Sequence, residues 1–240
     1  FHPRVFYPDV ETHRRFAFEM AESTGSLPER GREAQRELHQ AYRTLASGHG
    51  YNFPYSPLFY VPFLPLVPQE SEVVEDVMRH VGLLAAAAEV PLVFWLGGLL
   101  VSPALGLGAA VVAAAAPVLY SRLLYAMWPT LVGHVFDVLV IAAAASYLFA
   151  PSRRRLIGLG LAALAACLVY VSSLFNVPLL LATLALLERR HARALLAVAL
   201  LAPALAIALL YAPFVAVFLT EVLPLLAGGG AVGDTSGAVG

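Results

Sequence analysis

An acidic segment near the start of the chain carries the residue types of a proton-transfer site. It reads Tyr7-Pro8-Asp9-Val10-Glu11-Thr12-His13. Asp9 is a favourable helix N-cap, because its carboxylate can accept a backbone N–H of the first turn. The same carboxylate, with Glu11 and His13 nearby, is a candidate catalytic base at the mouth of a membrane cavity. The two interpretations are compatible, since a cap holds the carboxylate in one orientation.

A second group of ionisable residues lies within the apolar part of the chain. Arg122 either binds a phosphate through its fork of donors or extends its guanidinium to the membrane surface. His134 and Asp137 are three residues apart and share one helical face. Ionisable residues inside a membrane usually face the bundle interior, so we expect a hydrogen-bonded pair or the lining of a polar cavity. Glu89 is a further intramembrane carboxylate. Two such ligands do not define a metal site.

A stretch dense in aromatic residues and prolines precedes the apolar part. It reads Tyr51-Asn52-Phe53-Pro54-Tyr55-Ser56-Pro57-Leu58-Phe59-Tyr60. Aromatic side chains collect at the membrane–water interface, which favours an anchoring role for this stretch. The prolines exclude one long helix, and the apolar run 57–68 is too short to span a bilayer. We therefore expect a re-entrant or interfacial segment.

The common signatures of other catalytic and metal sites are absent from the sequence. It contains no glycine-rich phosphate loop, no nucleophile elbow, no HExxH motif and no cysteine cluster. Its single cysteine, Cys167, lies in an apolar run and fits a small core residue. The formal net charge of −1 does not indicate a nucleic-acid partner. Any enzymatic chemistry must therefore be built from carboxylates.

The elements that position these residues are predicted to be those of a membrane protein. Hydrophobic residues make up 60% of the chain and charged residues 13%, and the mean hydropathy is +0.76. Soluble domains carry about 25% charged residues, so lipid must solvate part of this chain. The first 80 residues hold 11 of the 16 acidic and 8 of the 15 basic residues, which places a loop-to-membrane boundary near His80. We expect both ends to be truncated, with a preceding membrane helix missing.

Local signals divide the chain into an all-α arrangement. Asp9 is expected to open a helix that runs to about Glu22, and Ser26 with Glu29 has the capping-box spacing of a second, amphipathic helix. After His80 we expect a polytopic transmembrane bundle. Its spans are predicted at 81–101, 104–124 and 130–149, with a hairpin at 156–188, a last span at 194–219 and a tail at 221–240.

Two arginine clusters, at 153–155 and 189–193, predict the topology. Basic clusters mark the cytoplasmic side, so the tract between them must turn back near 172–176. Counting the spans backward then places residues 1–80 and the tail on the extracytoplasmic side. We expect an integral, multi-pass protein of the plasma (inner) membrane.

The order of these features resembles the GT-C superfamily of integral-membrane glycosyltransferases, which includes protein O-mannosyltransferases and aminoarabinose transferases. Segment 7–13 looks like the acidic motif of that superfamily's first outer loop. Segment 51–60 looks like its Tyr-Pro-Pro-Leu-Tyr-Tyr segment, with Ser56 where the family usually has the first of two prolines. The hairpin followed by Glu188-Arg189-Arg190 looks like its short helix pair, which ends at a basic cytoplasmic loop.

The resemblance implies an inverting transfer of a sugar from a polyprenyl-phosphate donor to a hydroxyl of a glycan, lipid or protein. Asp9 would be the general base, with Glu11 as a second acid, since Val10 stands where some members have an adjacent carboxylate. Arg122, or a divalent cation such as Mg²⁺ or Mn²⁺, would neutralise the leaving phosphate. Substrate contacts would also come from His13, Tyr55, Tyr60, His134 and Asp137.

Two other functions are compatible with the sequence. A transporter or channel subunit would use His134, Asp137 and Glu89 as an ion or proton path. It would also predict internal repeats, and the 240 residues show none. A non-catalytic membrane scaffold would predict that Asp9 tolerates replacement.

Overall fold

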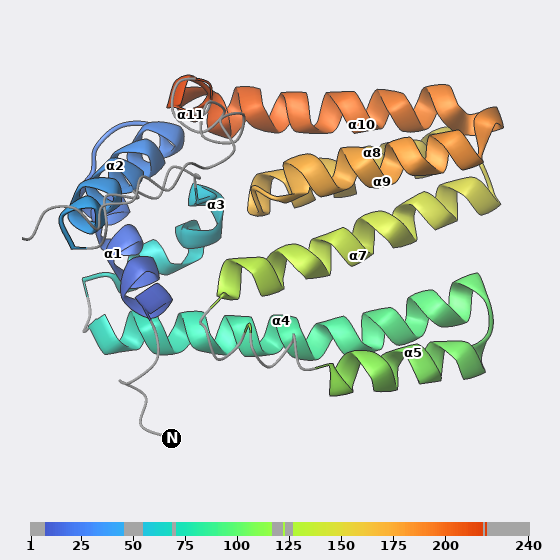
Figure 1. Cartoon of the computed structure of the whole chain (residues 1–240), viewed down its shortest axis with the longest axis horizontal. Coiled ribbons are helices and arrows are strands. Elements are labelled where there is room, and N and C mark those ends of the chain that lie inside the picture. The colour runs from blue at the N-terminus through green and yellow to red at the C-terminus, as the bar shows by residue number, and fades with distance from the viewer. Residues whose placement is uncertain are drawn as a thin grey trace, which may run out of the picture.

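The computed structural model describes residues 8–45, 55–68, 71–116, 122, 127–217 and 219. These residues form helices and no strands, which confirms the all-α prediction. Figure 1 shows long helices lying side by side as a bundle, with a group of shorter helices at one end. We call this group the N-terminal helix group. It consists of α1 (Pro8–Glu22), α2 (Leu27–Leu45), α3 (Pro57–Tyr60) and the 3-10 helix η1 (Val61–Leu66).

The turn between α1 and α2 follows from two residues. Gly25 has φ +107°, a left-handed conformation that glycine adopts without steric cost. The backbone N–H and the hydroxyl of Ser26 both donate to Glu29 Oε2, at 2.8 and 2.7 Å, so the predicted pair forms through the carboxylate of Glu29. These two hydrogen bonds hold the pKa of the Glu29 carboxyl below its usual value.

The first membrane helix begins earlier than the sequence indicated. α4 runs over Ser71–Leu100, whereas the span was predicted at 81–101. Its first three turns are polar, but Val74 and Met78 are fully buried against the N-terminal helix group. The change in composition near His80 is therefore not a helix boundary, because tertiary packing extends the helix beyond its apolar part.

Glycines allow α4 and α5 (Pro103–Ala115) to approach closely. A Cβ on Gly106 would lie 2.4 Å from the carbonyl oxygen of Phe94 and 2.7 Å from the backbone nitrogen of Gly98. Ser102 caps α5 by accepting the N–H of Leu105 at 3.3 Å. The span predicted at 104–124 continues beyond Ala115 into residues that lie mostly outside the described part of the chain.

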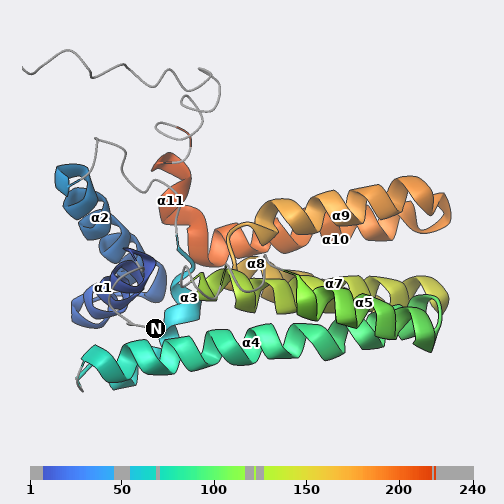
Figure 2. The ribbon, with the colours of Figure 1, turned by 60° about the horizontal axis from the view of Figure 1, so that its bottom comes forward.

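The remaining helices complete the bundle. They are α7 (Trp128–Phe149), α8 (Arg153–Val169), α9 (Ser173–Leu187), the short η2 (Arg189–His191), α10 (Ala192–Ala206), the π-helix η3 (Ile207–Tyr211) and α11 (Ala212–Val217). α8 and α9 occupy the tract 156–188 and turn at 170–172, so both arginine clusters lie at the same end of the bundle (Figure 1). Figure 2 shows α11 bending away from the axis of α10, next to α2.

Within the described part of the chain, three helical stretches are long and apolar enough to cross a membrane: Glu72–Leu100, Trp128–Phe149 and Arg189–Val215. The outside of the bundle exposes many large apolar side chains, for example Leu84 and Leu200 at 70% each. Such a surface, on helices of this length, indicates a membrane protein.

Candidate functional site

The buried His13 side chain is surrounded by aromatic rings. His13 is only 2% exposed, and its Nδ1 forms a 2.6 Å hydrogen bond with the Tyr60 hydroxyl. Its ring centroid lies 5.4 Å from that of Tyr55 and 5.6 Å from that of Trp128. We call this set of side chains the aromatic cluster; it comprises His13, Phe16, Tyr55, Phe59, Tyr60 and Trp128.

Three separate parts of the sequence build the aromatic cluster. α1 supplies His13, the segment around α3 supplies Tyr60, and the first turn of α7 supplies Trp128. Trp128 lies against α4 at Gly82, where an added Cβ would come within 2.5 Å of the indole. The cluster therefore joins both sequence motifs to the end of the membrane bundle.

Ser56 links the aromatic segment to the bundle. Its hydroxyl donates to the backbone carbonyl of Leu168, in the last turn of α8, and the Tyr211 hydroxyl donates to the same carbonyl at 3.3 Å. That carbonyl has no N–H of its own helix to accept, because α8 ends at Val169. A proline at position 56 would lack the hydroxyl and could not make this contact.

A second polar group lies inside the bundle. Ser173 Oγ, at the start of α9, donates to Asp137 Oδ1 of α7 at 2.8 Å. Glu89 of α4 and Asp137 are both close enough to His134 to act on it electrostatically. Glu89 Oε2 is buried and has no hydrogen-bond partner among the described residues. We call these four residues the intramembrane polar group; it comprises Glu89, His134, Asp137 and Ser173.

The two predicted acids of the first segment differ in position. α1 begins at Pro8, so Asp9 lies within the first turn of the helix rather than capping it, and its side chain is outside the described part of the chain. Positions 9 and 13 are one turn apart and share a face of α1. Glu11 lies on another face, is 56% exposed, and forms an ion pair with Arg14 at 2.5 Å. The helix therefore groups position 9, and not Glu11, with His13.

Arg122 lies between residues that the structure does not describe. It is half-buried, its backbone carbonyl accepts the N–H of Met127 at 2.9 Å, and its charge acts on His134. Residues 51–54 of the aromatic segment, and the sequence neighbours Ser121 and Tyr125 of Arg122, lie outside the described residues.

Three residues of these sites were not predicted. Trp128 covers His13, Ser173 binds Asp137, and Tyr211 binds the end of α8. Only Ser173 had a signal in the sequence, because it is one of the polar residues that interrupt the apolar tract 156–188.

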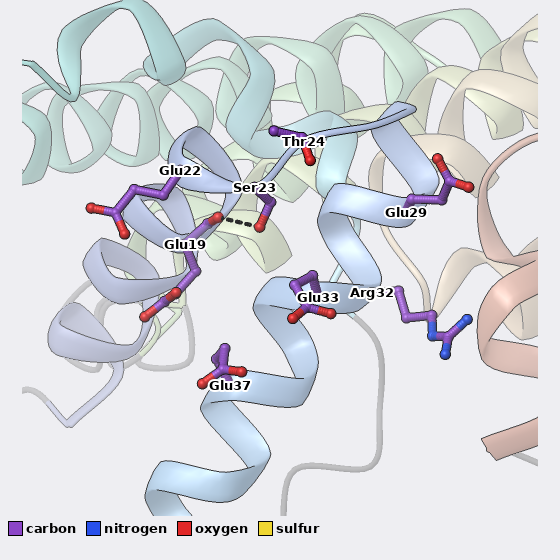
Figure 3. A pocket seen from close by; sticks show the side chains of 8 residues that line it. All are labelled: Glu19, Glu22, Ser23, Thr24, Glu29, Arg32, Glu33 and Glu37. Atoms are coloured by element: carbon purple, nitrogen blue, oxygen red, sulfur yellow. Dashed lines mark hydrogen bonds between the residues drawn. The ribbon is translucent and has the colours of Figure 1, made fainter.

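A pocket on the described surface does not belong to either polar site. It has a volume of about 590 Å³ and lies between α1 and α2 (Figure 3). Five glutamates and one arginine contribute to its wall, which also includes Ser23 and Thr24. Ser23 donates to the backbone carbonyl of Glu19 at 2.6 Å. The pocket is open to solvent, and the residues of the aromatic cluster do not line it.

Among the described residues, no three His, Cys, Asp or Glu side chains gather as a ligand set. The divalent cation implied by the resemblance stays a prediction, and no reaction step is assigned to it.

Fold and site together define a class, an α-helical membrane protein with two buried polar sites. Comparison of the chain with protein-family models, curated proteins and solved structures finds no match. The function must therefore be argued from the sites themselves.

Proposed function

We infer that this chain is part of a GT-C type glycosyltransferase, which transfers a sugar from a polyprenyl phosphate to an acceptor hydroxyl at the outer face of the plasma membrane. The observation that carries the proposal is the 2.6 Å hydrogen bond between His13 and Tyr60. It joins the acidic segment to the aromatic segment, and both meet the first turn of α7. A lipid-linked donor could reach such a site sideways from the bilayer.

In the proposed reaction, Asp9 takes the proton of the acceptor hydroxyl. The hydroxyl oxygen then forms a bond to the anomeric carbon from the face opposite the phosphate. The bond between that carbon and the phosphate oxygen breaks, and the electron pair leaves with the phosphate. The anomeric configuration is inverted. General-base catalysis of this kind contributes about 10²- to 10⁴-fold in rate.

Arg122 is the cation we assign to the leaving phosphate. A guanidinium offers a planar fork of donors that matches phosphate oxygens. The half-buried position of Arg122 supports a role within the protein rather than in the lipid headgroups. His13, Tyr55 and Tyr60 would shape the sugar side of the site.

The test uses membranes that contain the intact gene product, supplied with radiolabelled polyprenyl-phosphate sugars. We expect Asp9→Asn to lower sugar transfer at least about 100-fold, because the amide cannot accept the proton. Glu11→Gln should have a smaller effect, since Glu11 faces away from His13. Glu19→Gln is the matched control on the same helix, and should transfer sugar at the wild-type rate.

Accumulation of each variant in the membrane must be measured alongside transfer. Wild-type membranes that transfer none of the supplied sugars would contradict the proposal. Unchanged transfer by Asp9→Asn would mean that Asp9 has a structural role in the first turn of α1 and no catalytic role. If EDTA abolishes transfer and Mg²⁺ restores it, a metal ion and not Arg122 neutralises the charge of the leaving phosphate.

A second function, ion or proton transport, is supported by one observation. Glu89 Oε2 is buried without a hydrogen-bond partner among the described residues, and it lies near His134. Buried carboxylates of this kind occur along ion paths. If the chain transports protons, vesicles containing the wild type should acidify in response to a pH gradient and Glu89→Gln should not. The same variant should leave sugar transfer largely intact if the glycosyltransferase proposal is correct.

A further inference from the structure

The end of the bundle opposite the N-terminal helix group carries an unusual concentration of positive charge. The connection from α7 to α8 and the connection from α9 to α10 both lie there (Figure 1). Glu188 is the only acidic residue within 149–155 and 186–193. We call this surface the arginine end; it carries Arg153, Arg154, Arg155, Arg189, Arg190 and Arg193.

Side-chain contacts hold the two connections in place. The rings of Tyr147 and His191 meet edge to face, with centroids 5.5 Å apart. Arg155 donates to the backbone carbonyl of Ser146 at 2.8 Å, which fixes the start of α8 against the last turn of α7. The arginines of both connections therefore share one surface and are not independent loops.

The positive charges of this surface are not neutralised by the described part of the protein. All six arginines are exposed. Apart from the contact of Arg155 with Ser146, none of them forms an ion pair or a side-chain hydrogen bond within the described residues. By contrast, Arg14, Arg36 and Arg79 in the N-terminal half all pair with glutamates. Unpaired guanidinium groups attract anions.

Large apolar side chains surround the same arginines. Phe149 is 63% exposed and Ile157 is 53% exposed, on either side of the first connection. Leu186 and Leu187 are 76% and 74% exposed immediately before the second connection. A nucleic acid would neutralise the arginines but would leave these apolar side chains in water. A phospholipid supplies both an anionic phosphate and an acyl chain.

We propose that the arginine end is a binding site for anionic phospholipids, in which guanidinium groups from both connections bind headgroup phosphates. Arginine forms two parallel hydrogen bonds with phosphate oxygens. Basic clusters next to membrane helices bind the anionic lipids of the adjacent leaflet. The acyl chains lie along Phe149, Ile157, Leu186 and Leu187. This site is independent of the proposed sugar transfer.

The experiment uses the full chain, reconstituted in phosphatidylcholine vesicles with 20 mol% phosphatidylglycerol. The protein is extracted in mild detergent, and the retained lipids are identified by native mass spectrometry. We expect the wild type to retain phosphatidylglycerol well above its share of the vesicle. Arg153→Gln/Arg154→Gln and Arg189→Gln/Arg190→Gln should each lower that enrichment about five-fold or more. Each double variant keeps four arginines at this end, so the topology signal persists.

Two matched variants separate lipid binding from general charge and from folding. Arg32→Gln/Arg36→Gln removes the same charge from α2 and should leave the enrichment unchanged. Arg153→Lys/Arg154→Lys keeps the charge and should retain most of the enrichment. This variant still tests the proposal if the glutamine variants do not accumulate. The proposal is overturned if the wild type retains both lipids in the vesicle ratio. It is equally overturned if the α2 variant and the arginine-end variants lose phosphatidylglycerol alike.

Discussion

The aromatic cluster and the intramembrane polar group both hold polar side chains inside the protein, but they do so through different contacts. In the aromatic cluster, a single imidazole is held by rings from three distant segments, and its Nδ1 bonds to one phenol. In the intramembrane polar group, the polar residues lie on facing helices, and Asp137 bonds to Ser173. Packing of aromatic rings therefore positions the first site, whereas a hydrogen bond between facing helices positions the second. Changes to packing and changes to hydrogen bonds should affect the two sites separately.

The largest expected effect comes from Trp128→Ala. Trp128 is 2% exposed and packs on both His13 and Gly82, so its truncation leaves a cavity between α1, α4 and α7. We expect a loss of about 3–5 kcal/mol in unfolding free energy. Thermal unfolding in detergent would measure it, and limited proteolysis should show earlier cleavage of the N-terminal helix group.

Trp95→Ala is the control for this change, because Trp95 is the other tryptophan and is 50% exposed on α4. It should shift the unfolding midpoint only slightly. Equal shifts for the two variants would mean that packing at Trp128 does not hold the aromatic cluster together.

The next effect concerns the intramembrane polar group. Ser173→Ala removes the donor to Asp137 and leaves its carboxylate without that hydrogen bond. We expect a loss of about 1–2 kcal/mol. Hydrogen exchange should increase at the α8–α9 turn and remain unchanged in α1. Ser172→Ala is the neighbouring control, since the Ser172 side chain does not cap α9. Faster exchange in α1 would show that the two sites are coupled.

The smallest effect should come from the turn before α2, which neither site uses. Ser26→Ala removes one of the two hydrogen bonds to Glu29 and should lower the unfolding midpoint by less than about 2 °C. The pKa of Glu29 is lowered in the folded protein, so the stabilising contribution is present above the usual value of 4.5. It is lost as the pH falls through the lower, folded-state pKa.

A pH series of thermal unfolding checks this sign. The difference between wild type and Ser26→Ala should shrink as the pH falls below about 4.5. Glu29→Gln should remove the pH dependence of this contribution. A difference that grows on acidification would contradict the assignment.

Features that depend on residues close together in the sequence could be predicted from it. The all-α fold and the shared face of His134 and Asp137 depend on local composition and helical spacing, and both are visible in one segment at a time. The capping pair of Ser26 and Glu29 is also local, and the structure confirms it.

Features that depend on distant contacts were not predictable. Trp128 gave no signal because its partner His13 is over a hundred residues away in the sequence. The early start of α4 was missed because Val74 and Met78 lie in a polar stretch and become buried only by the N-terminal helix group. The glycosyltransferase activity and its site residues stay predictions, because they depend on chemistry at the side chain of Asp9.

The length of α4 has a consequence for how the protein responds to its membrane. Its 30 residues extend over about 45 Å, whereas the hydrocarbon core of a bilayer is about 30 Å thick. The excess of roughly three turns carries Val74 and Met78, on which the aromatic cluster rests. Because one helix joins both parts, the distance from the cluster to the bundle is fixed by the protein. In a thicker or thinner membrane, α4 must tilt or the lipids around it must stretch or compress, while that distance stays constant.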